Sequence, residues 1–195
     1  MAKVKGPLLS ISARGKIAKT LVFLSWKGID TVRKYVIPAN PKSADQQTQR
    51  GYFSDAIDAW HEDGYTTLDI AAWNLFATAQ KAVASGYNLF VKYYIAAKVA
   101  THTWTKLTGA AISDIAATGA TVTISVASDK TGKLYIGTKM TSMFTEFAGT
   151  FNEGKYTFTI TGLSELTKYY FYIKNTAASE DARTGIYSFT TIAAE

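Results

Sequence analysis

The pattern of apolar and polar residues changes twice along the chain. Residues 20–26 and 29–37 are rich in β-branched and aromatic residues and flank Lys27-Gly28, which predicts a β-hairpin. Residues 43–97 carry apolar residues at helical spacing, whereas apolar and polar residues alternate from Trp104 onward. The chain is therefore predicted to begin with a hairpin, to continue with helices and to end in strands.

Three helices are predicted between residues 43 and 97. Ser43 and Thr66 are each followed three residues later by Gln or Asp, the spacing of a capping box, so each is predicted to begin a helix. Gly86 is expected to end the second helix, because glycine is favoured just past a helix C-terminus. A third helix is expected at residues 88–97.

Alternating runs beyond residue 104 predict short strands. The runs lie at residues 120–127, 133–137, 155–160, 169–173 and 185–190. Turn sequences such as Asp129-Lys-Thr-Gly132 separate them, and short alternating strands at near-even spacing are typical of a β-sandwich. The predicted organisation is an α+β unit of a hairpin plus three helices at residues 1–97, a linker at 98–103 and an all-β sandwich at 104–192.

Two segments of the strand-rich region carry a recognisable motif. Thr159-Ile-Thr-Gly-Leu163 precedes Lys168-Tyr169, and the region closes with Tyr187-Ser-Phe-Thr-Thr191. This region resembles a fibronectin type III domain, in which a leucine precedes the tyrosine corner. Val126 stands where the family usually has tryptophan, and the integrin-binding tripeptide is absent. The resemblance implies a non-catalytic scaffold used for spacing and recognition, without integrin adhesion.

The amino-acid composition excludes several kinds of site and of cellular location. The 195 residues include no cysteine, which excludes disulfides, thiolate metal sites and cysteine nucleophiles. Arg14, Lys16 and Lys19 interrupt any apolar stretch near the start, so residues 1–20 do not have the pattern of a signal peptide. The apolar runs are too short to span a bilayer. We expect a protein made in the cytoplasm without a signal peptide and without a membrane partner.

The net charge of +6 is unevenly distributed. Residues 1–50 carry ten Lys and Arg against two acidic residues, which gives +8, while residues 51–97 carry −3. The candidate residues for binding nucleic acid or an acidic partner are Lys16, Lys19, Lys27, Arg33 and Lys34, interleaved with aromatic residues. The alternative is that these basic residues pair with the acidic helices that follow them.

Catalytic and metal-binding patterns are missing from the sequence. It contains no nucleophile elbow, dinucleotide-binding glycine motif or P-loop. His61 and His102 are its two histidines, too few for a local ligand set. Asp55, Asp58 and Glu62 share one helix face and are interpreted as a solvated surface. We therefore expect neither an enzyme nor a cofactor, metal or small-molecule substrate.

One aromatic group in the helical region has two interpretations. Tyr87, Phe90, Tyr93 and Tyr94 lie at helical spacing, which favours the core of the first unit. Part of the set could otherwise form a surface for self-association.

The hairpin itself predicts self-association. Its first strand is apolar on both faces, and a two-stranded hairpin leaves strand edges open. The candidate residues are Leu8, Leu9 and Ile11 of the preceding arm and Leu21, Phe23 and Trp26 of the strand. We expect a homo-oligomer in which the arm of one chain adds to the hairpin of another.

A second resemblance concerns the N-terminal half. The segments on which it rests include Ser25-Trp-Lys-Gly28, Pro38-Ala-Asn-Pro41 and Gly86-Tyr-Asn-Leu-Phe90. The segment 6–95 resembles small proteins of phage and prophage gene sets. This resemblance implies a structural subunit of a virion, as a capsid or tail component, or of another extracellular filament. The alternative hypothesis is a nucleic-acid-binding protein whose basic front coats DNA.

Overall fold

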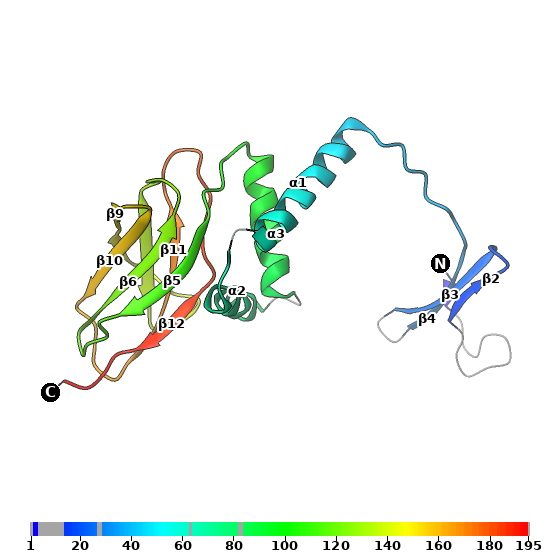
Figure 1. Cartoon of the computed structure of the whole chain (residues 1–195). Helices are drawn as coiled ribbons and strands as arrows, with labels where there is room; N and C mark the ends of the chain where they lie inside the picture. Colours follow the sequence, from blue (N-terminus) through cyan, green and yellow to red (C-terminus); the bar gives the residue numbers. More distant parts are fainter. Residues whose placement is uncertain (1, 4–13, 27–28, 63, 82–83, 195) are drawn as a thin grey trace. The chain divides into compact units, whose positions relative to one another are not determined.

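The computed structural model describes residues 2–3, 14–26, 29–62, 64–81 and 84–194. The chain forms two compact units, Met1–Ser43 and Ala44–Glu195. The expected classes of structure are present in the expected order: a hairpin, three helices and a sandwich-like all-β region (Figure 1). The boundary lies at Ser43–Ala44, however, and residues 98–103, expected to be a linker, lie inside the second unit.

The first unit is a small antiparallel sheet. Its strands are β1 (Ala2–Lys3), β2 (Gly15–Ile17), β3 (Leu21–Trp26) and β4 (Ile29–Lys34). They lie in the order β1-β4-β3-β2, so β3 and β4 form the expected hairpin at the centre of the sheet and β2 extends it on one side. The pairing places Leu21 opposite both Ile17 and Lys34, and Phe23 opposite Val32.

The helices are α1 (Ala44–Glu62), α2 (Thr67–Ala79) and α3 (Gly86–Val99). The capping box expected at Thr66 and Asp69 is confirmed. The expected role of Gly86 was wrong: α2 ends at Ala79, and Gly86 is the first residue of α3, after the N-cap Ser85. Here α3 approaches α2 so closely that a Cβ on Gly86 would lie 2.5 Å from the backbone of α2. Glycine is required at this position for space, not to end a helix.

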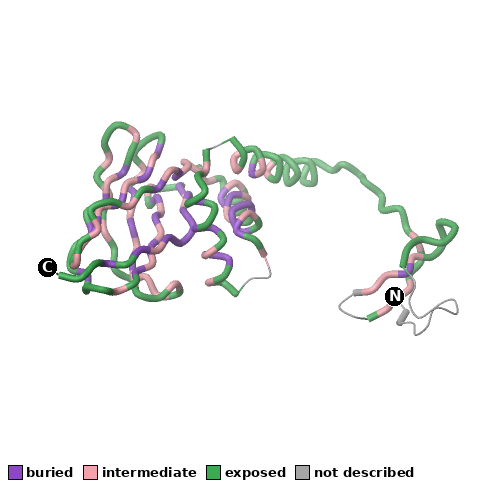
Figure 2. The backbone as a smooth tube through the Cα atoms, turned by 60° about the horizontal axis from the view of Figure 1, so that its bottom comes forward, coloured by how far each residue is buried: buried purple, intermediate pink, exposed green. Residues whose placement is uncertain are grey.

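Aromatic residues form the core of the helices. Phe90 is fully buried, and its ring lies 5.5 Å from that of Trp73 and 5.1 Å from that of Trp60. Tyr94 is also buried, and Tyr87 and Tyr93 pack against this core. The core interpretation of these aromatic residues is therefore confirmed. The first half of α1, by contrast, is exposed on nearly all sides (Figure 2).

Two four-stranded antiparallel sheets form the sandwich-like region. Their strands are β5 (Leu107–Ser113), β6 (Gly119–Val126), β7 (Gly132–Gly137), β8 (Thr145–Ala148), β9 (Thr150–Asn152), β10 (Lys155–Thr161), β11 (Lys168–Asn175) and β12 (Tyr187–Thr190). One sheet has the order β5-β6-β10-β9 and the other β12-β11-β7-β8. Alternate residues of each central strand are buried, as the sequence pattern predicts.

The helices and the sandwich share one packed unit (Figure 1). Ala72 of α2 belongs to the core of the sandwich, and Ile186 before β12 belongs to that of the helices. Trp104 lies where the sandwich was expected to begin, yet its ring lies 5.6 Å from the rings of Phe90 and Tyr94 in α3. The sandwich is thus built against the helices and not as a separate body.

One buried carboxylate links the two layers. Asp69 is 1% exposed and accepts hydrogen bonds from Gly109 N (2.8 Å), Ala110 N (3.3 Å) and the Tyr187 hydroxyl (2.6 Å), as well as from Thr66 in its own capping box. Gly109 has φ +66° and lies at a register shift in β5, which lets two successive N–H groups point at one anion. Burial, followed by the neighbouring Asp69 charge, raises the pKa of Tyr187 well above its usual value, so its hydroxyl remains a donor.

Replacing Asp69 should destabilise the second unit as a whole. We expect Asp69→Ala to lower the free energy of unfolding by about 3 kcal/mol or more, because several buried donors lose their acceptor. Denaturant unfolding followed by circular dichroism measures the change. Asp114→Asn, at an exposed turn position, is the control and should cost less than about 0.5 kcal/mol. Equal losses in the two variants would contradict the linking role of Asp69.

Candidate functional site

The described candidate basic residues, Lys16, Lys19, Arg33 and Lys34, are exposed but do not all lie on one face of the sheet. Lys16 and Arg33 both pair with Val22, so they lie on the same side of the sheet, whereas Lys34 pairs with Leu21 on the other side. Lys19 lies in the turn between β2 and β3. The Lys16 ammonium lies 4.7 Å from the centre of the Tyr35 ring. Lys27 lies outside the described residues.

The residues expected to mediate self-association differ in exposure. Phe23 is buried within the sheet at 9% exposed, so it contributes to the packing of its own unit. Leu21 is 42% exposed and lies directly opposite Ile17, which is equally exposed. Leu8, Leu9 and Ile11, and the side chain of Trp26, lie outside what the structure describes.

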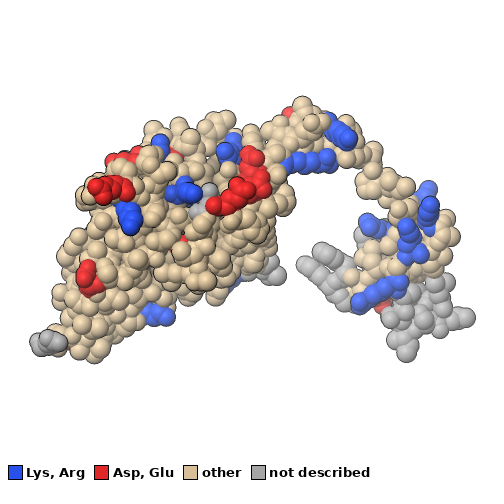
Figure 3. All heavy atoms as spheres, viewed as in Figure 1, with Lys and Arg blue, Asp and Glu red and all other residues tan. Residues whose placement is uncertain are grey.

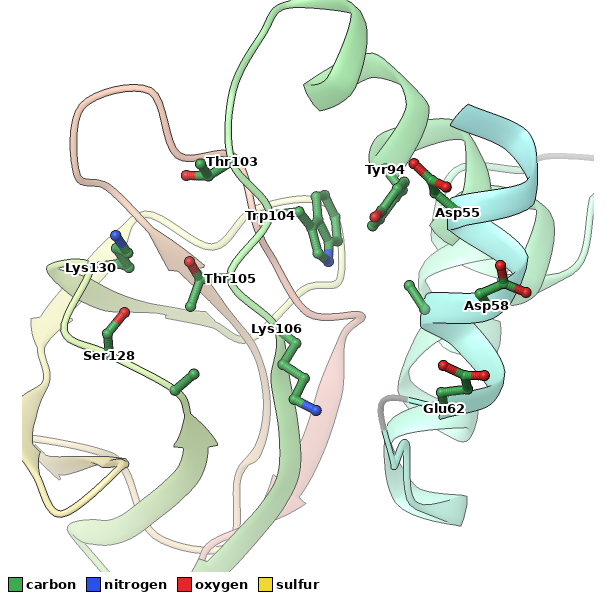
Figure 4. Close-up of a pocket in the computed structure, with 12 residues that line it drawn as sticks. Asp55, Asp58, Glu62, Tyr94, Thr103, Trp104, Thr105, Lys106, Ser128 and Lys130 are labelled. Atoms are coloured by element: carbon green, nitrogen blue, oxygen red, sulfur yellow. The ribbon is translucent and has the colours of Figure 1, made fainter. Parts of the chain in front are cut away.

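The second unit contains a cleft between α1 and the sandwich (Figure 4). Its volume is ≈ 600 Å³. Asp55, Asp58 and Glu62 of α1 form one wall, and Tyr94 and Trp104 lie between that wall and the sandwich. The three acidic residues are solvent-exposed, as expected, but they face a cleft and not open solvent. Lys106 and Lys130 also line the cleft, so it holds charges of both signs.

The sandwich wall of the cleft is held by a second buried carboxylate. Glu180 is 4% exposed and accepts hydrogen bonds from the hydroxyls of Thr103 (2.7 Å) and Thr105 (2.8 Å) and from Thr105 N (2.8 Å). Burial by itself raises the pKa of Glu180, but these hydrogen bonds and one from Ala182 N outweigh it, so the pKa lies below its usual value. The network fixes the segment that carries Trp104.

The sequence pattern did not indicate that Trp104 lines a cleft. Its indole Nε1 is buried without a hydrogen-bond partner in the described structure. The sequence shows Trp104 only as the start of a strand-rich region, because α1 and Trp104 are more than 40 residues apart and were assigned to different domains. No spacing signal connects them.

The expected lack of a metal or catalytic site stays a prediction. Within the described residues, no group of three or more His, Cys, Asp and Glu side chains is arranged to hold a metal ion. His102 Nδ1 lies 2.7 Å from Asp181 Oδ2, and His61 is exposed near the end of α1. No helix among the described residues is long and apolar enough to cross a membrane.

Comparisons with known proteins give only distant likenesses. No protein-family model and no curated protein matches the chain. Eight chains of solved structures match. One, described as a myokine structure, is 15% identical over 47% of this chain and 100% of that chain, with a TM-score of 0.39. Another, the crystal structure of Br derivative BhCBM56, is 14% identical over 46% of this chain and 96% of that chain, with a TM-score of 0.35. Likenesses this weak do not bear on function.

The Glu180 network makes a prediction about acid stability. Because the pKa of Glu180 is lower in the folded protein than its ordinary 4.5, the carboxylate stabilises the fold above that pH, and this contribution is lost as the pH falls through the folded value. Glu180→Gln should cost roughly 2 kcal/mol at neutral pH and progressively less as the pH falls below the ordinary pKa of a glutamate. Denaturant melts at several pH values measure the difference. Glu153→Gln, in an exposed turn, is the charge-matched control, and a pH-independent effect of Glu180→Gln would contradict the prediction.

Proposed function

We propose that this chain is a non-enzymatic structural subunit that self-assembles through its first unit and displays its second. The observation that carries the proposal is how little apolar surface the described part of the first unit buries. Phe23 is the one buried hydrophobic residue among the described residues of Met1–Ser43. Units of about this size rarely fold stably without disulfides, metals or oligomerisation, and the chain has no cysteine.

Exposed apolar groups and strand edges supply the means of association. Ile17, Leu21 and Ile29 are each just over 40% exposed on the small sheet. Among the described residues, β1 covers two of the six residues of β4, and β2 covers three of the six of β3. Uncovered backbone groups accept a strand from another chain. A second copy would therefore provide an apolar contact, and hydrogen bonds for the β3 and β4 residues that no described edge strand covers.

Opposite net charges of the two units favour head-to-tail association. The first unit carries nine basic residues and one acidic residue, which gives +8, and the second carries 12 basic and 14 acidic residues, which gives −2. Figure 3 shows basic side chains over the visible face of the small sheet and acidic side chains gathered near α1. Contacts between unlike surfaces of identical chains produce rings or filaments. This charge distribution supports an assembly of many copies.

The resemblance of residues 6–95 to phage and prophage proteins makes a virion the proposed setting, with another extracellular filament as the broader form of the proposal. The proposed identity of the displayed region is a fibronectin type III-like sandwich. Two observations support it: the division of the strands into two antiparallel sheets, and the Tyr169 hydroxyl, which accepts a hydrogen bond from Ser164 N at 2.9 Å, as a tyrosine at a sandwich corner would.

The assembly proposal predicts the effect of one double substitution. Ile17→Thr with Leu21→Thr removes a directly opposed exposed pair while keeping residues that favour strands. We expect the full-length protein to form oligomers, seen as ordered particles by electron microscopy, and the variant to associate roughly tenfold to hundredfold more weakly by sedimentation.

The control is Val99→Thr with Ile192→Thr, which removes two exposed apolar residues of the second unit (60% and 52% exposed). This control should assemble like the unaltered protein. A full-length protein that stays monomeric at high concentration would refute the proposal, and so would equal weakening by the two double variants.

Nucleic-acid binding is the second candidate function. Four described basic residues of the first unit, Lys16, Lys19, Arg33 and Lys34, are exposed, and Lys16 lies over an aromatic ring. Exposed cations next to aromatic groups suit phosphates and stacked bases. These cations lie on both sides of the sheet. They would therefore make more contacts with nucleic acid that wraps around the sheet than with nucleic acid lying along one side of it.

If this function is correct, affinity for DNA should depend steeply on salt. Four phosphate contacts predict a loss of about a hundredfold between roughly 50 and 200 mM salt. Replacing Lys16, Lys19, Arg33 and Lys34 by Ser should abolish binding in a fluorescence anisotropy titration. The charge-matched control replaces four exposed lysines of the second unit, Lys92, Lys139, Lys155 and Lys168. Binding that is absent, insensitive to salt, or lost equally in the control excludes the basic sheet as a nucleic-acid site.

A further inference from the structure

Arg183 lies where the chain crosses from the sandwich to the helices. It belongs to the segment between β11 and β12, and this segment touches the backbone of α2. A Cβ on Gly185 would lie 2.3 Å from Trp73 N, and Ile186 N donates a hydrogen bond to Ala72 O at 2.9 Å. A glycine is needed for this contact, and the contact holds Arg183 over the helices.

Three aromatic rings from three different elements surround the Arg183 guanidinium. Its central carbon lies 4.2 Å from the ring centre of Phe76 in α2, 4.6 Å from that of Tyr172 in β11 and 5.2 Å from that of Tyr93 in α3. These rings hold the planar group in one orientation. Burial lowers the pKa of Arg183, although an arginine remains charged at neutral pH.

This cation has no anionic partner in the described structure. Its Nε donates to Thr184 O at 3.2 Å, and its terminal amino groups make no hydrogen bond or ion pair with the residues that the structure describes. A guanidinium usually uses those two amino groups to bind a carboxylate side by side. The fold therefore orients a cation whose best hydrogen-bonding edge is unused.

Arg183 lines a pocket of ≈ 370 Å³. Lys81 is a second cation in its lining, and the described lining contains no acidic residue. Phe76, Met140, Met143 and Phe144 give the pocket an apolar surface. Phe144 is 85% exposed, so a large aromatic ring borders the pocket without packing of its own. Such a ring gains buried area only when something binds beside it.

We infer that this pocket binds an apolar group that carries a carboxylate. The carboxylate would accept paired hydrogen bonds from Arg183, with Lys81 adding charge, while the apolar part would lie against Phe144 and the methionines. The volume, near the lower end for ligand pockets, suits a ligand the size of one large side chain. Such a group can be a free carboxylic acid or the C-terminal residue of a peptide.

The test uses the full-length protein and matched pairs of probes. 3-Phenylpropionate and its neutral amide are titrated, followed by the peptide Gly-Gly-Phe with a free or an amidated C-terminus. We expect the free acid forms to bind with a Kd of the order of 1 mM or below and the amides to bind at least about tenfold more weakly. Backbone amide shifts in nuclear magnetic resonance should concentrate at Gln80, Thr141 and Phe144. Tighter binding of the peptide acid than of phenylpropionate identifies a chain terminus as the source, and the reverse order identifies a free acid.

Two substitutions locate the binding. Arg183→Gln should weaken binding of the acid by about tenfold or more and remove the preference for acid over amide. Lys168→Gln is the control, because Lys168 is likewise a cation over an aromatic ring, 5.5 Å from Tyr170, but it does not line the pocket, and it should change nothing.

Phe144→Ala is the second variant, and it removes a ring that contributes little to the packing of the fold. It should weaken both acid and amide severalfold, and it keeps the inference testable if Arg183→Gln does not fold. The inference is overturned if neither acid binds saturably up to about 10 mM, if acid and amide bind equally, or if Phe144→Ala leaves the binding unchanged.

Discussion

The second unit depends on a single carboxylate that is shared between a helix and two strands. Asp69 completes the capping box of α2 and also accepts hydrogen bonds from the bulge of β5 and from Tyr187 of β12. A buried carboxylate is stable only when donors surround it, so helix and sandwich must be in place together. This requirement explains why the helices and the sandwich form one compact unit, although the sequence pattern changes sharply between them.

The cleft beside α1 and the pocket at Arg183 both exist because the helices pack against the sandwich. The cleft between α1 and the sandwich has one wall on α1 and the other on the segment that hydrogen-bonds to Glu180. The three rings around Arg183 come from α2, α3 and β11, and the pocket that Arg183 lines takes Phe144 from the segment before β8. Neither arrangement would exist if the two layers were independent. The two pockets also differ in charge: carboxylates and lysines both line the first, whereas the described lining of the second has cations and no acidic residue.

The two units differ in how much apolar surface they bury. The second unit buries two large apolar clusters, whereas the small sheet of the first buries Phe23 among its described residues and leaves Ile17, Leu21 and Ile29 partly exposed. A sheet with so little core gains stability by packing against another surface. This difference is the physical basis of the proposal that the first unit assembles and the second is displayed.

Local patterns in the sequence were sufficient for the three helices, the β3–β4 hairpin and five strands of the sandwich, but they did not indicate β5, β8 or β9. Alternation predicted the central strands, and the three-residue spacing of Thr66 and Asp69 predicted a capping box, because both depend on neighbours along the chain. The partners of Asp69 at Gly109 and Tyr187, the close approach at Gly86 and the rings around Arg183 depend on residues far apart in the sequence, and no local pattern encodes them. The sequence by itself therefore determined the three helices and the central strands of the sandwich, but not its edge strands β5, β8 and β9. Only the tertiary structure decided that helices and sandwich form one unit, because that union depends on buried hydrogen bonds and close backbone contacts between distant residues.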